Sequence, residues 1–393
     1  MRGAPTLPVV LAGSAAFLNL YMTQPLLPLL ARRFGASTFE VGLTITAPTV
    51  AVALTAPLIG RLADRMGLRR VIVASVWTLT AATALAATSA SLRQLVFWRF
   101  VQGVATPGIF ASTIAYIHEV WPASHSGRAT AAYMSGTVLG GFTGRAVAGL
   151  VASDANWQAA FVALAALTAI VAAALSLWLP AEPRHDMPVR RPPAHPMHLF
   201  RNRRLVATCG VGFCILFTQV AMFTYVTFHV AAPPYSLSTV ALGWLFVVYL
   251  VGAAVMPLSG RWVDIYGHRT GIASAMAIGG AGALMTLLPW LPAIICGLTL
   301  CATGVFIAQG TASSYIGAVT TQDRALAVGL YSTFYYAGGS VGAALPAALW
   351  TRAGWPGCIA LIVAVQAAGV VLAFTQWTPA PASHDVVLPE PGV

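Results

Sequence analysis

The sequence predicts an all-α membrane protein with twelve transmembrane helices in two pseudo-symmetric six-helix bundles. Its 393 residues are 58% hydrophobic and only 8% charged, with a mean hydropathy of +0.79. Soluble domains carry about 25% charged residues, so this composition excludes a soluble enzyme. The second observation is a series of apolar segments of membrane-spanning length. The third is a motif that occurs once in each half of the chain.

Each apolar segment is bounded by Gly, Pro or Arg and has roughly the 20 residues that a membrane-spanning helix needs. The first six are predicted at 7–30, 40–60, 71–89, 93–117, 129–152 and 157–179. The second six are predicted at 205–231, 239–259, 270–288, 291–317, 325–349 and 354–377. Residues 1–179 therefore form an N-terminal bundle, and residues 205–378 form a C-terminal bundle.

Residues 180–204 join the bundles and carry six prolines and six arginines. Proline at this density breaks helices and the charges oppose burial in lipid, so we expect a polar linker. Basic residues accumulate in cytoplasmic loops. With the N-terminus inside, fifteen of the 21 arginines lie on the cytoplasmic side, four lie outside and two lie within spans. This predicts a cytoplasmic linker, cytoplasmic termini and a cytoplasmic tail at 379–393.

A thirteen-residue motif is repeated at an offset of 200 residues. Residues 57–69 read PLIGRLADRMGLR, and residues 257–269 read PLSGRWVDIYGHR. Seven positions match, where about one match is expected by chance at ordinary residue frequencies. Duplicated six-span halves are an architecture of transporters.

The first copy of this motif resembles the loop between spans two and three of the major facilitator superfamily, and the resemblance extends over nearly the whole chain. In that family the loop latches the two halves together on the cytoplasmic side. By resemblance, this gate role falls to Gly60, Asp64, Arg65, Gly67 and Arg69, with Asp264 and Arg269 in the second half. The alternative is a solvated loop that only obeys the positive-inside rule.

Two arginines lie within predicted spans, where a charge is costly unless it is paired or hydrated. Arg99 opens a stretch that resembles the family's fourth-span signature, although it could also snorkel to the outer surface. Arg145 lies deep in span five and is expected to point into the central cavity. The alternative is a structural arginine bound by backbone carbonyls or by polar residues of the other half.

Three glycines of span five, Gly136, Gly140 and Gly144, form a stripe that lets another helix approach closely. They resemble the glycine-rich fifth-span signature of antiporters in the family, except that Gly141 and Arg145 replace its Pro and a Gly. The stretch from Tyr21 to Pro28, with these glycines, resembles the YnfM-like inner-membrane transport proteins of the drug:proton antiporter group. This resemblance implies a multi-pass protein of the bacterial inner membrane.

In the family, spans one, four, seven and ten line the central cavity. Polar side chains on these spans are therefore candidate solute contacts, or equally helix–helix hydrogen bonds. They are Asn19, Tyr21, Gln24, Gln102, Gln219, Tyr225 and Gln309. Tyr335 and Tyr336 of span eleven add either an aromatic wall or core packing.

None of the ten acidic residues lies near the middle of a predicted span. Many proton-coupled exporters embed a carboxylate in the membrane, whereas this cavity offers arginine. We therefore expect a monomeric secondary transporter that exports a small anionic or neutral organic solute by alternating access, with protons as the coupling ion. An uncoupled facilitator or an importer of the same fold is the alternative.

Other classes of protein are not favoured by the sequence. It has no GxxxxGK[ST] nucleotide-binding loop, no cysteine or histidine spacing typical of a metal site, and no nucleophile constellation of an enzyme. We expect no cofactor and no metal. The net charge of +11 comes from arginines in short loops, so nucleic acid is not an expected partner.

Overall fold

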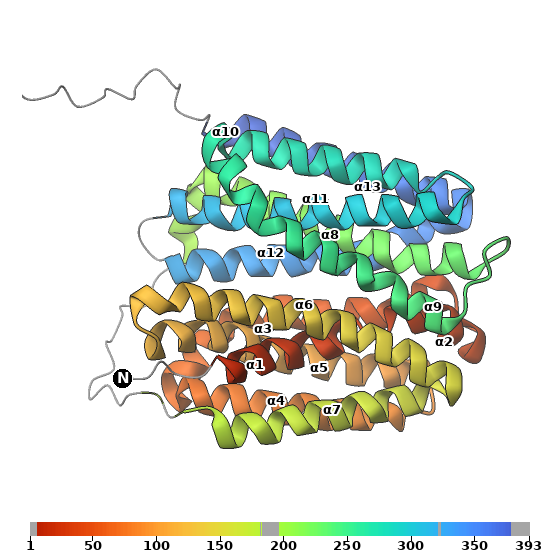
Figure 1. Cartoon of the computed structure of the whole chain (residues 1–393), viewed down its shortest axis with the longest axis horizontal. Helices are drawn as coiled ribbons and strands as arrows, with labels where there is room; N and C mark the ends of the chain where they lie inside the picture. The colour runs from red at the N-terminus through yellow and green to blue at the C-terminus, as the bar shows by residue number, and fades with distance from the viewer. Residues whose placement is uncertain (1–5, 181, 183–195, 321–323, 379–393) are drawn as a thin grey trace, which may run out of the picture.

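A computed structural model describes residues 6–180, 182, 196–320 and 324–378. Every regular element within these residues is a helix. Figure 1 shows the helices lying roughly parallel to the long axis, with the first half of the chain (red to yellow) on one side and the second half (green to blue) on the other. The predicted two-bundle helical fold is confirmed. Most of the predicted linker, and the predicted tail at 379–393, lie outside the described residues.

The helices follow the order of the predicted spans. The first bundle contains α1 (Leu7–Leu20), η1 (Gln24–Leu26), α2 (Leu27–Phe34), α3 (Thr38–Met66), α4 (Leu68–Ala87), α5 (Leu92–Val120), α6 (Ala123–Asp154) and α7 (Trp157–Trp178). After the short η2 (Pro196–Arg201), the second contains α8 (Arg203–Ala231), α9 (Thr239–Trp244), η3 (Leu245–Val247), α10 (Val248–Met285), α11 (Leu291–Val319), α12 (Arg324–Ala344) and α13 (Pro346–Gln376).

Nine helical segments in the described residues are long and apolar enough to cross a membrane. One of them, Thr239–Met285, holds two spans because Gly267 interrupts it with a φ of 82°. The glycine-rich α6 and α12 also have the length of a span, with 32 and 21 residues. Together these segments supply the twelve predicted crossings. Gly354, with a φ of 61°, divides α13 between spans eleven and twelve.

Polar caps at the start of several helices explain why the spans begin where they do. At α3 the Ser37 hydroxyl accepts from the Glu40 backbone N–H, and the Glu40 carboxylate accepts from the Ser37 N–H. This reciprocal pair satisfies two N–H groups that the first turn leaves without partners. The side chains of Ser91, Asn156, Asn202 and Ser238 cap α5, α7, α8 and α9 by accepting a backbone N–H of the first turn, without the reciprocal bond.

The glycine stripe of α6 packs directly on α1. A Cβ added to Gly136, Gly140 or Gly144 would lie 2.2, 2.4 or 1.9 Å from a backbone carbonyl oxygen of α1. A Cβ added to Gly338 or Gly342 of α12 would likewise lie 2.1 or 2.5 Å from a backbone carbonyl oxygen of α8. The two bundles therefore share a helix pairing, span one on span five and span seven on span eleven, that only glycine permits.

The molecule has two ends along its helices. The described chain ends, Thr6 and Thr378, lie at one end, here called the termini end, together with the turns at Gly67 and Gly267. The opposite end, here called the far end, holds the turns at Gly35 and Gly354. Between the bundles, α3 packs on α12 and α6 packs on α9.

Candidate functional site

Span one is not a continuous helix. α1 ends at Leu20, residues 21–23 form turns, and Pro25 lies in the short η1. Proline has no N–H to donate to the preceding turn, so carbonyl groups near the break need other donors. Broken helices of this kind occur in membranes where the freed backbone groups are bound by protein. Here the break also turns Tyr21 and Gln24 toward the second bundle.

Arg99 supplies the donors for this break. Its Nε donates to the Thr44 carbonyl at 2.9 Å, and its Nη1 donates to the Asn19 carbonyl at 2.7 Å. Nη1 also bonds the side chain of Gln102, and Nη2 bonds the carbonyl of Leu20. The side chain is 0% exposed, so the snorkelling interpretation is wrong. Four of the five guanidinium N–H groups bind the protein itself, and Arg99 fastens α1, α3 and α5 together.

A chain of hydrogen bonds extends from Arg99 through the first bundle. Gln102 donates to the Thr83 hydroxyl at 2.8 Å, and Thr83 donates to the Asn19 side chain at 3.1 Å. Asn19 in turn donates to the Thr168 hydroxyl at 2.9 Å. All of these side chains are buried. Asn19 and Gln102, predicted as solute contacts or helix–helix bonds, thus bond neighbouring helices in this structure.

Arg145 lies between the two bundles, beside Gln24 of the span-one break. Its Nε donates to Gln24 Oε1 at 2.8 Å, and its Nη1 donates to the Gly141 carbonyl at 2.6 Å. The guanidinium carbon lies 4.6 Å from the ring centre of Phe246 and 5.1 Å from that of Tyr249. Both rings belong to the second bundle. Arg145 is 3% exposed and therefore does not face lipid.

The charge of Arg145 is not neutralised by the described residues. No acidic side chain among them forms an ion pair with it, and its Nη2 donates to none of them. Aromatic faces attract a cation but do not replace a counter-ion. Arg145 and Arg99 are therefore different: the donors of Arg99 are almost all used, whereas a buried cation with free donors remains at Arg145.

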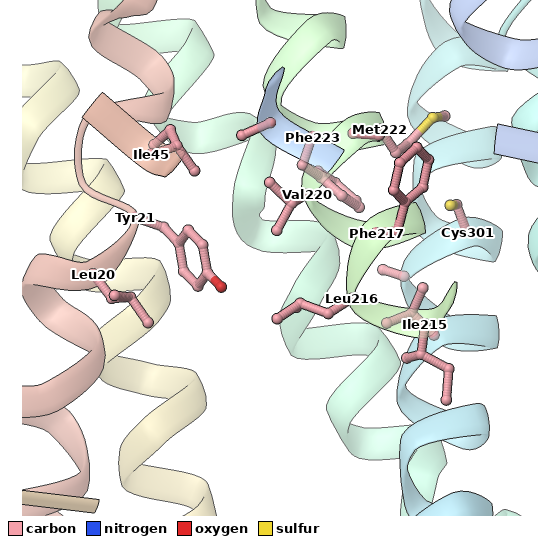
Figure 2. Packing of buried hydrophobic residues seen from close by; sticks show 14 of the residues in the cluster. Leu20, Tyr21, Ile45, Ile215, Leu216, Phe217, Val220, Met222, Phe223 and Cys301 are labelled. Carbon is pink, nitrogen blue, oxygen red and sulfur yellow. The ribbon is translucent and has the colours of Figure 1, made fainter. Parts of the chain in front are cut away.

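Two tyrosines, Tyr21 and Tyr249, lie beside the Arg145 guanidinium, and Tyr335 and Tyr336 form a separate aromatic contact. The Tyr21 ring centre lies 5.2 Å from the guanidinium carbon, and the Tyr21 hydroxyl is buried without a hydrogen-bond partner in the described residues. Figure 2 shows the Tyr21 side chain pointing from α1 toward Leu216 and Val220 of α8. Tyr335 and Tyr336 pack edge to face, and Tyr336 also stacks on Phe110 of α5.

The other residues that the sequence predicts in the cavity make contacts of their own. The Tyr225 hydroxyl donates to the Ala343 carbonyl at 2.8 Å, so it joins α8 to α12. Gln219 is half-buried beside the Tyr249 hydroxyl, and Gln309 is half-buried on α11. Gln24, besides binding Arg145, donates to the Thr224 hydroxyl of α8 at 3.3 Å.

Hydrogen bonds between the bundles in the described part of the chain lie at or near the far end. In addition to Gln24 and Thr224, Thr46 donates to the Ser340 carbonyl at 3.3 Å, and Ser340 donates to the Thr49 hydroxyl at 2.9 Å. Gly149 and Gly243 bring α6 and α9 into backbone contact there. A groove of about 640 Å³ runs beside this interface, lined by α3, α12 and α13.

The repeated loops occupy the termini end, where apolar side chains of both copies are exposed. Leu58 is 54% exposed and its equivalent Leu258 is 75% exposed. Gly67 and Gly267 share a left-handed φ, 86° and 82°. Gly60, Asp64, Arg65 and Asp264 lie on the surface.

The arginines that end the two motifs bind the last helix of their own bundle. Arg69 donates to the carbonyls of Ser176 and Leu179 at the end of α7, and Arg269 donates to the carbonyl of Trp377 at the end of α13. Two tyrosines that the sequence did not single out as gate residues repeat this pattern. Tyr116 donates to the Pro180 carbonyl, and the Tyr315 hydroxyl accepts from the Thr378 N–H. In this conformation the described contacts of both arginines stay within one bundle.

The pseudo-symmetric bundles, the broken first span and the buried cation between the halves define a membrane transporter rather than an enzyme. Residues 9–311 and 228–390 match the family description Major Facilitator Superfamily. The chain belongs to this superfamily.

Two bacterial relatives resemble the chain over most of its length. It is 30% identical to the Bacillus subtilis protein named MFS-type transporter YybF, covering 89% of this chain and 88% of the relative. It is also 30% identical to the Escherichia coli inner membrane transport protein YnfM, covering 92% and 88%.

Proposed function

We propose that this protein is a secondary active transporter that exports a small anionic or neutral organic solute across the bacterial inner membrane by alternating access, with protons as the coupling ion. The observation that carries the proposal is Arg145, a buried cation between the two bundles with free donors and no carboxylate counter-ion among the described residues. A solute that binds there contacts both halves, which is the requirement for a site that the halves expose alternately.

The positions of the contacts support alternating access. The hydrogen bonds between the halves at Thr46, Thr49 and Ser340 close the far end. At the termini end, the motif arginines bind within their own bundles. This arrangement fits a state that is open at the termini end. If the termini are cytoplasmic, as the arginine distribution predicts, the state is inward-facing and ready to load a solute for export.

The positive charge of Arg145 supports an anionic or neutral solute. Bringing an organic cation beside Arg145 would place two like charges in a site of low dielectric, which is costly. An anion would instead supply the counter-ion that the described residues do not. The name of the E. coli relative, inner membrane transport protein, supports the proposed location.

Transport by the purified chain in proteoliposomes tests this function. Vesicles with an imposed pH gradient are assayed with labelled anionic, neutral and cationic solutes. The proposal predicts accumulation of an anionic or neutral solute that changes with the gradient. Transport that does not change with the pH gradient would indicate the uncoupled facilitator instead. Accumulation of cations alone would contradict the role of Arg145.

A further inference from the structure

We propose that the solute is a planar aromatic monocarboxylate whose carboxylate binds Arg145. This inference rests on the proposed function and specifies its substrate class. Three observations carry it: donors of Arg145 that no described residue uses, the aromatic rings around the guanidinium, and the buried Tyr21 hydroxyl, which has no partner in the described part of the chain.

The donors of Arg145 fit one carboxylate. Nε and one N–H of Nη1 donate to Gln24 and Gly141, and no other described residue accepts from the two N–H groups of Nη2 or the second of Nη1. Nη1 and Nη2 together can bind the two oxygens of a carboxylate in a forked arrangement. The same contact would neutralise the charge of the guanidinium.

A solute with one negative charge is favoured over a solute with two. Of the two arginines within the spans, Arg99 is already bound by three carbonyls and Gln102. The sequence contains no lysine. A dicarboxylate or a phosphate ester at Arg145 would therefore leave one charge buried without a partner, which is strongly unfavourable.

The walls around Arg145 are aromatic. Phe246, Tyr249 and Tyr21 surround the guanidinium within 5.2 Å of their ring centres. Phe223 extends this surface, with its ring 4.5 Å from that of Tyr249 in an edge-to-face contact. A solute whose carboxylate reaches Arg145 must place its body against these rings. Ring-to-ring contacts are worth more than the burial of equal aliphatic area, so a flat aromatic body is favoured.

The Tyr21 hydroxyl supplies a further contact. It is buried and has no partner among the described residues, and such a group costs free energy until it finds one. Tyr21 and Arg145 are neighbours, so the hydroxyl can donate to a carboxylate oxygen held by the guanidinium. Figure 2 shows that the side chain already projects toward α8 across the interface of the bundles.

Binding of three matched probes to the purified full-length protein tests the proposal. Benzoate carries both the ring and the charge, cyclohexanecarboxylate keeps the charge without the aromatic ring, and benzamide keeps the ring without the charge. Isothermal titration should show benzoate binding at least about tenfold more tightly than either of the other two. Equal affinity for benzoate and cyclohexanecarboxylate would overturn the aromatic specificity, and equal affinity for benzamide would overturn the charge requirement.

Two variants assign the contacts. Tyr21→Phe keeps the ring and removes the hydroxyl, so benzoate affinity should fall about fivefold, the value of one hydrogen bond. Tyr235→Phe, which removes the hydroxyl of a half-buried tyrosine in the loop after α8, is the matched control and should leave affinity unchanged. Unchanged affinity in Tyr21→Phe would remove this residue from the site.

Failure of this inference differs from failure of the proposed function. A protein that binds none of the three probes but accumulates another anionic or neutral solute in proteoliposomes is still a transporter with a different substrate. A protein that binds benzoate but moves no solute in either direction would contradict the proposed function instead.

Discussion

At the residue scale, the two arginines within the spans show how similar sequence signals can have different structural outcomes. Arg99 is enclosed by the first bundle and donates to the Asn19 and Leu20 carbonyls at the break in span one and to the Thr44 carbonyl of α3. Arg145 faces the other bundle and keeps donors that none of the residues in the described ranges uses. The number of donors already bound separates a structural arginine from one that is available to a solute.

Substitution of Arg99 should therefore destabilise the protein. Arg99→Gln leaves at least two buried carbonyls without donors, and each such group costs about 1–3 kcal/mol. We expect a loss of roughly 3 kcal/mol of stability, seen as a marked fall in the temperature at which the detergent-solubilised protein aggregates during size-exclusion chromatography. An aggregation temperature equal to that of the native chain would refute the structural role.

Substitution of Arg145, unlike that of Arg99, should reduce transport without lowering stability. Arg145→Gln removes a buried charge that lacks a counter-ion among the described residues, so the aggregation temperature should stay the same or rise. Transport of the solute should fall by at least about 100-fold, because a buried charge-assisted contact of roughly 3 kcal/mol is lost. Undiminished transport would exclude Arg145 from solute binding.

The sequence predicts the part of the Arg145 site that lies on span five, but it does not predict the part that lies on the second bundle. A charge in span five next to a glycine stripe is visible in the sequence because helical spacing is local. Phe246 and Tyr249 lie about 100 residues later in another bundle, and no periodic pattern links them to Arg145. The orphan hydroxyl of Tyr21 was equally hidden, since it results from the tertiary packing around the break.

At the element scale, glycine stripes determine how the helices pair. The stripe of α6 was visible from its spacing of four residues. No such stripe is predicted on α12 from the sequence, yet Gly338 and Gly342 have the same four-residue spacing, and this spacing is the signal that identifies them. Span boundaries were less predictable, because polar first and last turns such as those of α3 extend beyond the apolar segment.

Adding one methyl group to the stripe should disrupt this pairing. The Cβ of Gly144→Ala would lie 1.9 Å from the Leu18 carbonyl oxygen, a backbone atom that cannot move without shifting α1. We expect a destabilisation of about 1–3 kcal/mol from overpacking, measured as a lower aggregation temperature. Gly60→Ala is the matched control, because no described atom beyond its own stretch of helix lies within 4 Å of the added Cβ. Equal effects of the two changes would argue against close packing of α1 and α6.

At the scale of the whole molecule, the two bundles are similar in topology but different in polarity. The buried network of Asn19, Thr83, Arg99 and Gln102 fastens the first bundle internally. At an offset of 200 residues the second bundle has Thr299 and Ala302 in place of Arg99 and Gln102. The first bundle thus has a buried polar network, and the second places the rings of Phe246 and Tyr249 against Arg145 across the interface.

A disulfide across the far end should stop the conformational changes that transport requires. Thr49→Cys with Ser340→Cys places two thiols where hydroxyl groups now lie 2.9 Å apart, close enough for a disulfide to form with a small adjustment. Oxidation should abolish transport in proteoliposomes, and reduction should restore it. The single Thr49→Cys and Ser340→Cys variants, treated identically, should show no oxidation-dependent loss. Full transport by the cross-linked protein would mean that the far end does not need to open.

Paired spin-label distances at both ends test alternating access most directly. One protein carries labels at Phe39→Cys and Leu345→Cys at the far end, and another carries them at Met66→Cys and Tyr266→Cys at the termini end. All four positions are exposed, and Cys296, the one exposed cysteine among the described residues, is replaced by Ser. Measured in lipid nanodiscs across a pH series, the long-distance population at the far end should grow as that at the termini end shrinks. Both ends widening together, or one fixed distance at each end under every condition, would contradict the account.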